Sequence, residues 1–247
     1  MSPPAPSAPF LHGFERLFDL SEDERDHLHQ LVQESIQVPP RRKLVDAGKV
    51  HEQAFILKAG WMIEFKMLRD GGRQILDFKL PGEVVGIDSL AYAVAPHSSA
   101  TLTQCEVARL PREALLETHG RFPKLAAGLF LMSLREGAIL HQWELSLGRR
   151  SAYQRTAHLI AELHCRAWLR GLLDGSSFPF PVTQQDLADC LGLTPPYVNR
   201  ILRQLRDGDL VRIEERRLEV MDVPKLAQVA GFDPAYLKEW GRRGRQD

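Results

Sequence analysis

The chain has 247 residues, 44% of them hydrophobic, and its 32 basic residues balance its 32 acidic ones, so its formal net charge is zero. This length accommodates two domains with cores of their own, and the balanced charge argues against avid non-specific binding to nucleic acid, which basic residues drive. No segment approaches the roughly 18 consecutive apolar residues of a membrane-spanning helix, so we expect a cytoplasmic protein that does not enter the membrane.

Three cysteines, Cys105, Cys165 and Cys190, are widely spaced and form no CxxC pair. This pattern disfavours a disulfide framework and fits a reducing compartment. Each cysteine is interpreted as a small buried hydrophobe. A redox role, above all for Cys190, stays open as an alternative.

The first 20 residues are predicted to form a flexible N-terminal tail. Residues Met1–Pro9 are rich in proline, serine and alanine, and they lack the basic start and apolar run of a signal peptide. Ser21 then caps a short helix that extends to Leu31, because Glu24 occupies the last position of a capping box.

Residues 21–122 are expected to form a β-rich domain. Short runs of apolar and β-branched residues between about Ile36 and Leu110 are separated by glycines. Strands are predicted at Ala54–Leu57, Met62–Met67 and Gln74–Leu80, with an Asp-Gly-Gly turn at residues 70–72 between the last two. Regularly spaced short strands with glycine turns indicate a small β-barrel or jelly roll.

Residues 123–150 are expected to form one long helix, Lys124–Leu147, and a hinge. Apolar residues fall on two stripes of this helix, and such a helix must be covered on both sides. One stripe contains Phe130, Leu134, Ala138 and Leu145. We assign one face to the β-rich domain and the other to a second subunit, and burial of both faces within one chain is the alternative. The predicted dimer contacts are Leu129, Met132, Glu136, Ile139 and Trp143.

Residues 151–222 carry the most informative pattern. After a helix predicted at about Ala152–Leu173, Thr183 can cap the first helix of a helix-turn-helix, and Gly192 permits the sharp turn that follows it. A second helix begins at Pro195, a position where the missing N–H costs nothing. Apolar residues at i, i+3, i+4 and i+7 must face a core, and in the second helix these are Val198, Ile201, Leu202 and Leu205.

The opposite face of this second helix is polar and is predicted to read DNA. Arginine can make two hydrogen bonds to guanine and asparagine two to adenine, so the base-reading residues are predicted to be Asn199, Arg200 and Arg203. A two-stranded wing around the Glu214–Arg217 turn places Arg216 or Arg217 near the phosphate backbone. Residues 223–247 are predicted to form a small C-terminal helix or tail with a solvated basic end at Arg242–Arg245.

The whole pattern resembles the cyclic-AMP receptor protein/fumarate-nitrate regulator superfamily of bacterial transcription factors, over about Leu28–Met221. The motifs of the β-rich part are VDAGKV, LKAG, DGGRQ and PGEVVG, and the most specific motif is TQQDLADCLGLTPPYVNRILRQL. The resemblance implies an α+β fold with an N-terminal double-stranded β-helix of the cyclic-nucleotide-binding type, a long dimerisation helix and a C-terminal winged helix-turn-helix. It also implies a homodimer on a palindromic site in double-stranded DNA, with RNA polymerase as a partner if the protein activates transcription.

The family motif can be carried over residue by residue. Arg200 matches the family's base-reading arginine, and Arg203 falls at a second position that faces the groove. Pro195 and Pro196 depart from the polar residues that are usual there, which predicts a DNA site different from the family's best-known sequences. The predicted phosphate contacts are Thr183, Gln184, Thr194, Tyr197, Arg216 and Arg217.

The effector site departs further from the family. Cyclic-AMP binders carry a Gly-Glu pair and then an Arg-Ser pair, but here Gly86 is followed by Ile87, and no arginine lies between Arg73 and Arg109. Isoleucine cannot replace a ribose-binding carboxylate, and Asp88 could do so only after a one-residue shift. We therefore predict that cyclic AMP does not bind and leave the effector unknown. The resemblance places the effector pocket at Gly86, Ile87, Asp88, Ser98, Ser99, Leu140 and His141.

No cofactor, metal ligand or catalytic residue is predicted. The iron–sulfur branch of the family uses N-terminal cysteines, whereas the first cysteine here is Cys105, and an isolated His97 gives little support for haem. The enzyme alternative is a metal-dependent β-barrel, but the His-x-His pair at residues 27–29 falls in a predicted helix. The other alternative is a ligand-sensing dimer that acts through protein partners and binds DNA weakly.

Overall fold

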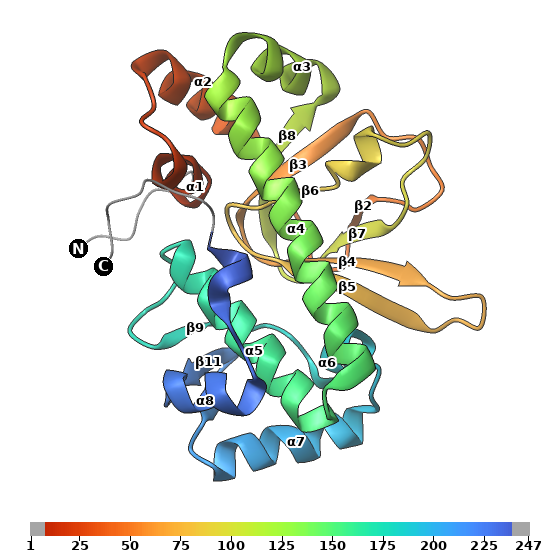
Figure 1. Ribbon diagram of the computed structural model, residues 1–247. Coiled ribbons are helices and arrows are strands. Elements are labelled where there is room, and N and C mark those ends of the chain that lie inside the picture. Colours follow the sequence, from red (N-terminus) through yellow and green to blue (C-terminus); the bar gives the residue numbers. More distant parts are fainter. Residues whose placement is uncertain (1–7, 239–247) are drawn as a thin grey trace. The chain divides into compact units, whose positions relative to one another are not determined.

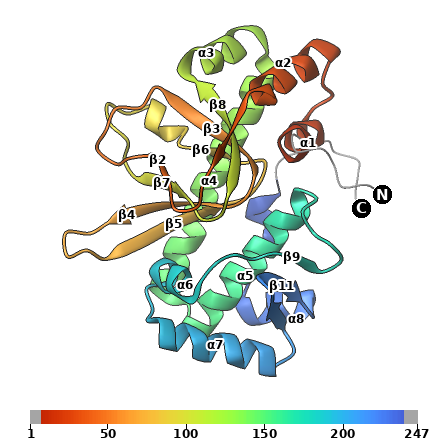
Figure 2. The same ribbon diagram turned by 180° about the vertical axis from the view of Figure 1, so that it is seen from behind.

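The computed structural model describes residues 8–238, which divide into two compact units (Figure 1, Figure 2). The first unit contains the described residues up to 66 together with 78–135, and the second contains 67–77 together with 136–237. The long helix α4 (Pro123–Arg149) contributes one part to each unit. No helix within residues 8–238 is long and apolar enough to span a membrane.

The N-terminal region contains a helix, α1 (Ala8–Leu17), where the sequence predicted a flexible tail over residues 1–20. Phe10 and Phe14 lie one turn apart, contact each other edge to face and are buried in the core of the first unit. Gly128 makes room for Phe14, because a Cβ at this glycine would lie 2.4 Å from the Phe14 ring. The tail prediction is therefore wrong for residues 8–17, since their apolar spacing outweighs the proline-rich composition before them. Residues 1–7 lie outside the described part.

The next helix, α2 (Glu22–Gln33), begins with the predicted capping box. The Glu24 backbone N–H donates to the Ser21 hydroxyl at 3.2 Å, and the Ser21 N–H donates to the Glu24 carboxylate at 2.7 Å. These bonds satisfy two backbone donors that the start of a helix leaves without partners.

The predicted jelly roll is present as two four-stranded antiparallel sheets, with strand orders β1-β8-β3-β6 and β2-β7-β4-β5. Ile56 and Leu57 are neighbours on β3 but enter different core clusters, because successive side chains of a strand point to opposite faces. The three strands predicted from sequence correspond to β3, β4 and β5. The strands are β1 (Ser35–Val38), β2 (Lys43–Val45), β3 (Gln53–Ala59), β4 (Met62–Met67), β5 (Arg73–Lys79), β6 (Val84–Val85), β7 (Ser98–Thr101) and β8 (Cys105–Pro111). A short 3-10 helix, η1 (Asp88–Leu90), and the helix α3 (Arg112–Arg121) complete the first unit before α4.

The second unit contains the predicted helix-turn-helix. The helix α5 (Ala152–Leu169) begins at a capping box of Ser151 and Gln154 and ends four residues earlier than predicted. The helix α6 (Gln184–Leu191) ends at Gly192, whose φ of 61° is the left-handed conformation that the sharp turn requires, and α7 (Pro195–Asp207) follows.

A three-stranded sheet of order β10-β11-β9 forms the wing. The strands β10 (Val211–Glu214) and β11 (Arg217–Val220) are joined by Glu215 and Arg216, both with positive φ, and the third strand, β9 (Ser177–Pro179), was not predicted. The predicted C-terminal helix corresponds to α8 (Val223–Ala230), which the short 3-10 helix η2 (Pro234–Leu237) follows. The basic end at Arg242–Arg245 lies outside the described residues.

Candidate nucleic-acid interface and effector site

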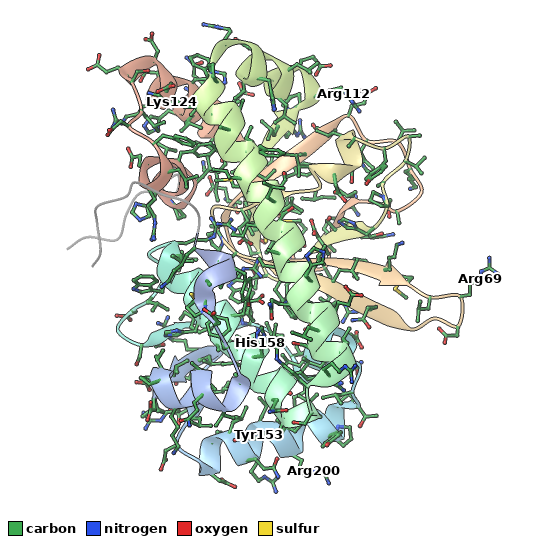
Figure 3. The ribbon with its side chains drawn as sticks, viewed as in Figure 1. Arg69, Arg112, Lys124, Tyr153, His158 and Arg200 are labelled. Carbon is green, nitrogen blue, oxygen red and sulfur yellow. The ribbon has the colours of Figure 1, made fainter. Side chains whose placement is uncertain are left out.

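The helix α7 has one buried face and one polar face. Val198, Ile201, Leu202 and Leu205 are all buried, as their spacing predicted. Arg200 and Arg203 are exposed on the other side, while Asn199 is half-buried. Figure 3 shows Arg200 on the outer side of α7, directed away from the helices of the second unit. The predicted base-reading arginines are thus accessible to a partner.

Tyr197 and Arg200 form a stacked pair on this surface. The Arg200 guanidinium carbon lies 4.4 Å from the centre of the Tyr197 ring, a geometry that favours a cation–π interaction. Tyr197 therefore holds the guanidinium in one orientation besides being a candidate phosphate contact. The sequence placed both residues on the interface but did not predict their pairing.

The start of α7 differs from the predicted cap. Thr194 has the extended backbone of an N-cap residue, but its side chain makes no capping hydrogen bond. An N-cap side chain usually accepts from the second or third backbone N–H of the helix, and Pro196 removes the first of these donors. The Thr194 hydroxyl consequently remains available for a phosphate oxygen.

The start of α6 is already engaged within the chain. The Thr183 hydroxyl accepts from the Asp186 N–H at 3.1 Å and donates to the Asp186 carboxylate at 2.6 Å, so it serves the predicted cap. Gln184, the next predicted phosphate contact, is exposed.

The two candidate arginines of the wing have different environments. Arg216 lies in the turn between β10 and β11, is exposed and has a φ of 58°. Arg217 donates to the Ser177 hydroxyl at 2.9 Å and lies 3.6 Å from the Asp174 carboxylate. Arg217 is thus bound within the second unit, and Arg216 is the arginine free to extend from the wing.

A cluster of four charged side chains lies inside the first unit, and sequence reasoning missed it. The Glu64 carboxylate is 3.4 Å from Lys79 Nζ and 3.5 Å from His97 Nε2, and it accepts a long hydrogen bond from the Gly86 N–H. His97 Nδ1 lies 3.3 Å from the Asp88 carboxylate. Glu64 and Lys79 are buried, and no local sequence pattern distinguished them from the other charged residues of β4 and β5.

The cluster fixes the charges of its members. Burial alone would raise the pKa of Glu64, but Lys79 and His97 outweigh burial and hold this pKa well below its ordinary value. Burial would lower the pKa of His97, but Glu64 and Asp88 outweigh it and raise this pKa. For Asp88 burial dominates and raises the pKa. The contacts in the cluster therefore keep Glu64 ionised and favour the protonated form of His97.

Most of the predicted effector residues surround this cluster. Gly86 has a φ of 73° and donates to Glu64, whereas Ile87 packs against the hydrophobic core and does not replace a carboxylate. The Ser98 hydroxyl accepts from the Ala47 N–H, and the buried Ser99 hydroxyl has no hydrogen-bond partner among the described residues. Leu140 and His141, the other two members of the predicted set, belong to the second unit and are exposed on α4.

The predicted dimer stripe is directed into the chain itself. Leu129 and Met132 belong to the core of the first unit, Ile139 is buried, and Trp143 donates to Glu162 in the second unit, while Glu136 is half-buried. Leu129, Met132, Ile139 and Trp143 are therefore buried within the chain and not available for the predicted dimer contact, whereas the other stripe is exposed, so the alternative in which both faces are buried within one chain does not hold. The exposed apolar residues of α4 are Phe130, Leu134, Leu140, Leu145 and Leu147.

A second buried polar network lies in the second unit. The Glu162 carboxylate accepts from Trp143 Nε1 at 3.0 Å and from the Tyr236 hydroxyl at 2.7 Å, and it lies 3.4 Å from the Arg166 guanidinium. Arg166 also donates to Asp77 at 2.8 Å. Burial raises the pKa of Glu162 to about 7.

The aromatic ring of Tyr236 also stacks on His158, which Figure 3 labels on α5. Burial lowers the pKa of His158 to about 4. Among residues 8–238 no group of three or more histidine, cysteine, aspartate or glutamate side chains is arranged to hold a metal ion.

Comparisons with known proteins agree with this architecture. Residues 35–121 match the family model of the cyclic nucleotide-binding domain, and residues 154–229 match that of the Crp-like helix-turn-helix domain. The chain is 26% identical over 216 residues to the fumarate and nitrate reduction regulatory protein of Shigella dysenteriae, covering 87% of this chain and 85% of the relative. It is 24% identical over 221 residues to the anaerobic regulatory protein of Pasteurella multocida (strain Pm70), covering 90% and 81%.

Solved structures share the fold. FixK2 from Bradyrhizobium japonicum aligns with a TM-score of 0.71 at 24% identity, covering 79% of this chain and 96% of that one. The c-di-GMP responsive global regulator CLP of Xanthomonas campestris aligns with a TM-score of 0.63 at 15% identity, covering 80% and 99%.

A cyclic-nucleotide-binding-like β-roll joined through a long helix to a winged helix-turn-helix defines a class of DNA-binding proteins. The chain belongs to the Crp-Fnr superfamily within this class and is a DNA-binding transcription regulator.

Proposed function

We propose that the protein binds a palindromic DNA site as a homodimer in the bacterial cytoplasm, with one α7 in the major groove of each half-site. The supporting observation is the two-faced α7: four apolar residues fix it to the second unit, while its arginines are exposed. In this arrangement Asn199, Arg200 and Arg203 read bases. The phosphate contacts are Gln184, Thr194, Tyr197 and Arg216, with Thr183 and Arg217 first having to leave their partners within the chain.

Selection from a random DNA pool tests this function. We expect the purified protein without added ligand to enrich a palindrome at fixed salt. Arg200→Ala should lose about 1–3 kcal/mol at one base pair of each half-site. Arg206→Ala is the matched control, because Arg206 is an exposed arginine at the far end of the same helix. Unchanged cellular regulation by the Arg200→Ala variant would instead favour the alternative in which the dimer acts through protein partners.

The dimer contact is proposed to use the exposed stripe of α4. The side chains of Phe130 and Leu134 are 61% and 54% exposed and lie one turn apart, so a second copy of the helix can cover them as in a coiled coil. Leu134→Glu should give monomers in sedimentation equilibrium and abolish binding to the palindrome. Leu116→Glu on α3 is the control, because Leu116 is at least as exposed. A Leu134→Glu variant that remains dimeric would place the contact elsewhere.

We further propose that cyclic AMP is not the effector. The position of the family's ribose-binding carboxylate is taken by Ile87, which packs against the core, and Asp88 is paired with His97. Lys79 is paired with Glu64, so the cluster offers no uncompensated cation for a phosphate. Calorimetric titration should give no stoichiometric binding at micromolar cyclic AMP, and such binding would contradict the proposal.

Two further roles follow from the family. The relatives are transcription regulators, which supports a role without catalysis. RNA polymerase is the proposed partner if the protein activates its target promoters.

A further inference from the structure

A short segment of the β-roll sequence is part of the second unit. Residues 67–77, here called the strap, connect β4 to β5 and include the first five residues of β5. The contacts of the strap with α5 and α6 lie within the second unit.

Arg73 of the strap bridges two carboxylates of α6. Its Nη2 lies 2.7 Å from the Asp186 carboxylate and its Nε lies 2.6 Å from the Asp189 carboxylate. The two aspartates are three residues apart and therefore lie on one face of the helix. Burial opposes the charge of Arg73, but the aspartates outweigh burial and raise its pKa. One guanidinium thus neutralises both acids of the first helix of the DNA-binding motif.

Gln74 makes a second contact at the other end of α6. Its side-chain amide donates to the Cys190 carbonyl at 3.0 Å. This carbonyl belongs to the last turn of the helix, where carbonyls have no partner within the helix. Gly192 and the turn to α7 follow two residues later, so the strap contacts α6 immediately before the chain turns into the recognition helix.

Asp77 anchors the strap to α5. Its carboxylate accepts from Arg166 at 2.8 Å, and both side chains are buried. Two residues further along the same strand, Lys79 pairs with Glu64 in the charge cluster of the first unit. A single strand, β5, therefore carries contacts to α6, to α5 and to the cluster at the predicted effector site.

We propose that Arg73 is a positioning residue for DNA binding: it holds α6, and through the turn at Gly192 also α7, in the orientation that reads DNA. This inference rests on the proposed DNA-binding function. Without Arg73, α6 keeps two mostly buried carboxylates without their cation. These carboxylates repel each other and the phosphates of bound DNA, so the loss of Arg73 weakens binding although Arg73 does not touch DNA.

The test uses the full-length protein and the palindromic duplex that the wild type enriches from a random pool. Arg73→Met should weaken binding about tenfold, which corresponds to about 1.4 kcal/mol. Arg69→Met is the matched control: it removes the same charge from the same strap, and Figure 3 shows Arg69 pointing into solvent. Arg73→Lys keeps the charge without the two-pronged geometry and should lose about threefold.

Two readouts distinguish a positioning role of Arg73 from a direct contact with DNA. If Arg73 touched a phosphate, Arg73→Met would reduce the slope of log K against log salt by about 0.9, whereas a positioning role leaves the slope unchanged. If Arg73 acts through α6, adding Asp189→Asn to Arg73→Met should restore part of the affinity, because one uncompensated carboxylate is removed. Thermal melting should show the same transition for all variants, which ensures that DNA binding is compared between folded proteins.

The outcomes are distinct from those of the proposed function. If the wild type enriches no palindrome, the proposed function fails before the strap is tested. If it does, and Arg73→Met binds the duplex within twofold of Arg69→Met, the positioning role is overturned. A reduced salt slope, or no rescue by Asp189→Asn, overturns it as well.

Discussion

The two units bury their charges in opposite ways. In the first unit Glu64 lies beside both Lys79 and His97, and Asp88 lies beside His97. In the second unit two carboxylates, Asp77 and Glu162, both contact the guanidinium of Arg166. The remaining partners of Glu162 are the neutral donors of Trp143 and Tyr236.

This difference decides how each network responds to pH. In the balanced cluster Lys79 and His97 outweigh burial and keep the pKa of Glu64 low, so Glu64 stays ionised. In the second unit burial outweighs Arg166 and raises the pKa of Glu162 to about 7. In the second unit the group that takes up a proton near neutral pH is thus a carboxylate, Glu162, whereas in the first unit it is the imidazole of His97, whose pKa is raised, and Glu64 stays ionised.

Removal of a cation from the balanced cluster should have the largest effect. Lys79→Met leaves Glu64 buried without its main partner, and breaking a buried ion pair in this way costs about 3–5 kcal/mol. We expect this loss in the free energy of unfolding measured with urea. The control is Glu64→Gln combined with Lys79→Met, which removes both charges and should recover most of the stability. If the double variant is as unstable as Lys79→Met, the loss of stability comes from altered packing and not from the unpaired charge of Glu64.

The corresponding change in the second unit should depend on pH. Arg166→Met removes the guanidinium that contacts both Asp77 and Glu162, which raises the pKa of Glu162 further because Arg166 lowers it in the native protein. We expect a cost of about 3 kcal/mol at pH 8 and a smaller cost at pH 6, where Glu162 is protonated. Arg166→Met made in the Glu162→Gln background is the control and should show little change between the two pH values, because the titrating carboxylate is absent. If Arg166→Met lowers the free energy of unfolding equally at pH 6 and pH 8, the protonation of Glu162 does not control the stability of this network.

Sequence patterns predicted what depends on local spacing. The helix-turn-helix, its glycine turn, the wing and the strands β3, β4 and β5 of the β-roll all follow from caps, periodicity and turn residues, each of which acts over a few residues. The exposed positions of Arg200 and Arg203 follow from the same periodicity as the buried Val198 and Leu205.

The missed features depend on contacts between distant segments. The sequence shows two apolar stripes on α4 but does not show which of them is buried within the chain. That depends on α1, whose Phe14 packs against α4 at Gly128. The Glu64 cluster joins residues of β4, β5 and the segment before β7, and Arg73 meets Asp186 across 113 residues of chain. No local pattern encodes such pairings, because β4 and β5 each carry more than one charged residue and their spacing does not show which of these are buried and need a partner.

The pH dependence of the second network can be isolated with Glu162→Gln. The pKa of Glu162 is raised in the folded protein, so the folded state binds a proton more tightly than the unfolded chain does, and stability falls as pH rises from about 4.5 to about 7. We expect the free energy of unfolding of the wild type, relative to Glu162→Gln, to decrease by about 2 kcal/mol over this window and to level off above it. Taking the difference cancels the opposite contribution of His158, whose lowered pKa destabilises the fold as pH falls from 6.5 to about 4. A constant difference would mean that Glu162 stays ionised throughout.

The smallest expected effect concerns the hydroxyl of Tyr236. This group donates to the Glu162 carboxylate at 2.7 Å and so favours its ionised form. Tyr236→Phe keeps the ring that stacks on His158 and removes only this donor, at a cost of about 1 kcal/mol. Without this hydrogen bond the pKa of Glu162 should be higher than in the wild type. The stability of Tyr236→Phe should therefore level off at a higher pH than the stability of the wild type. Trp143 still donates to Glu162 in this variant, so the shift measures how far the Tyr236 hydroxyl alone lowers the pKa of Glu162. A variant with an unchanged pH profile would leave burial and Arg166 as the groups that set the protonation of this network.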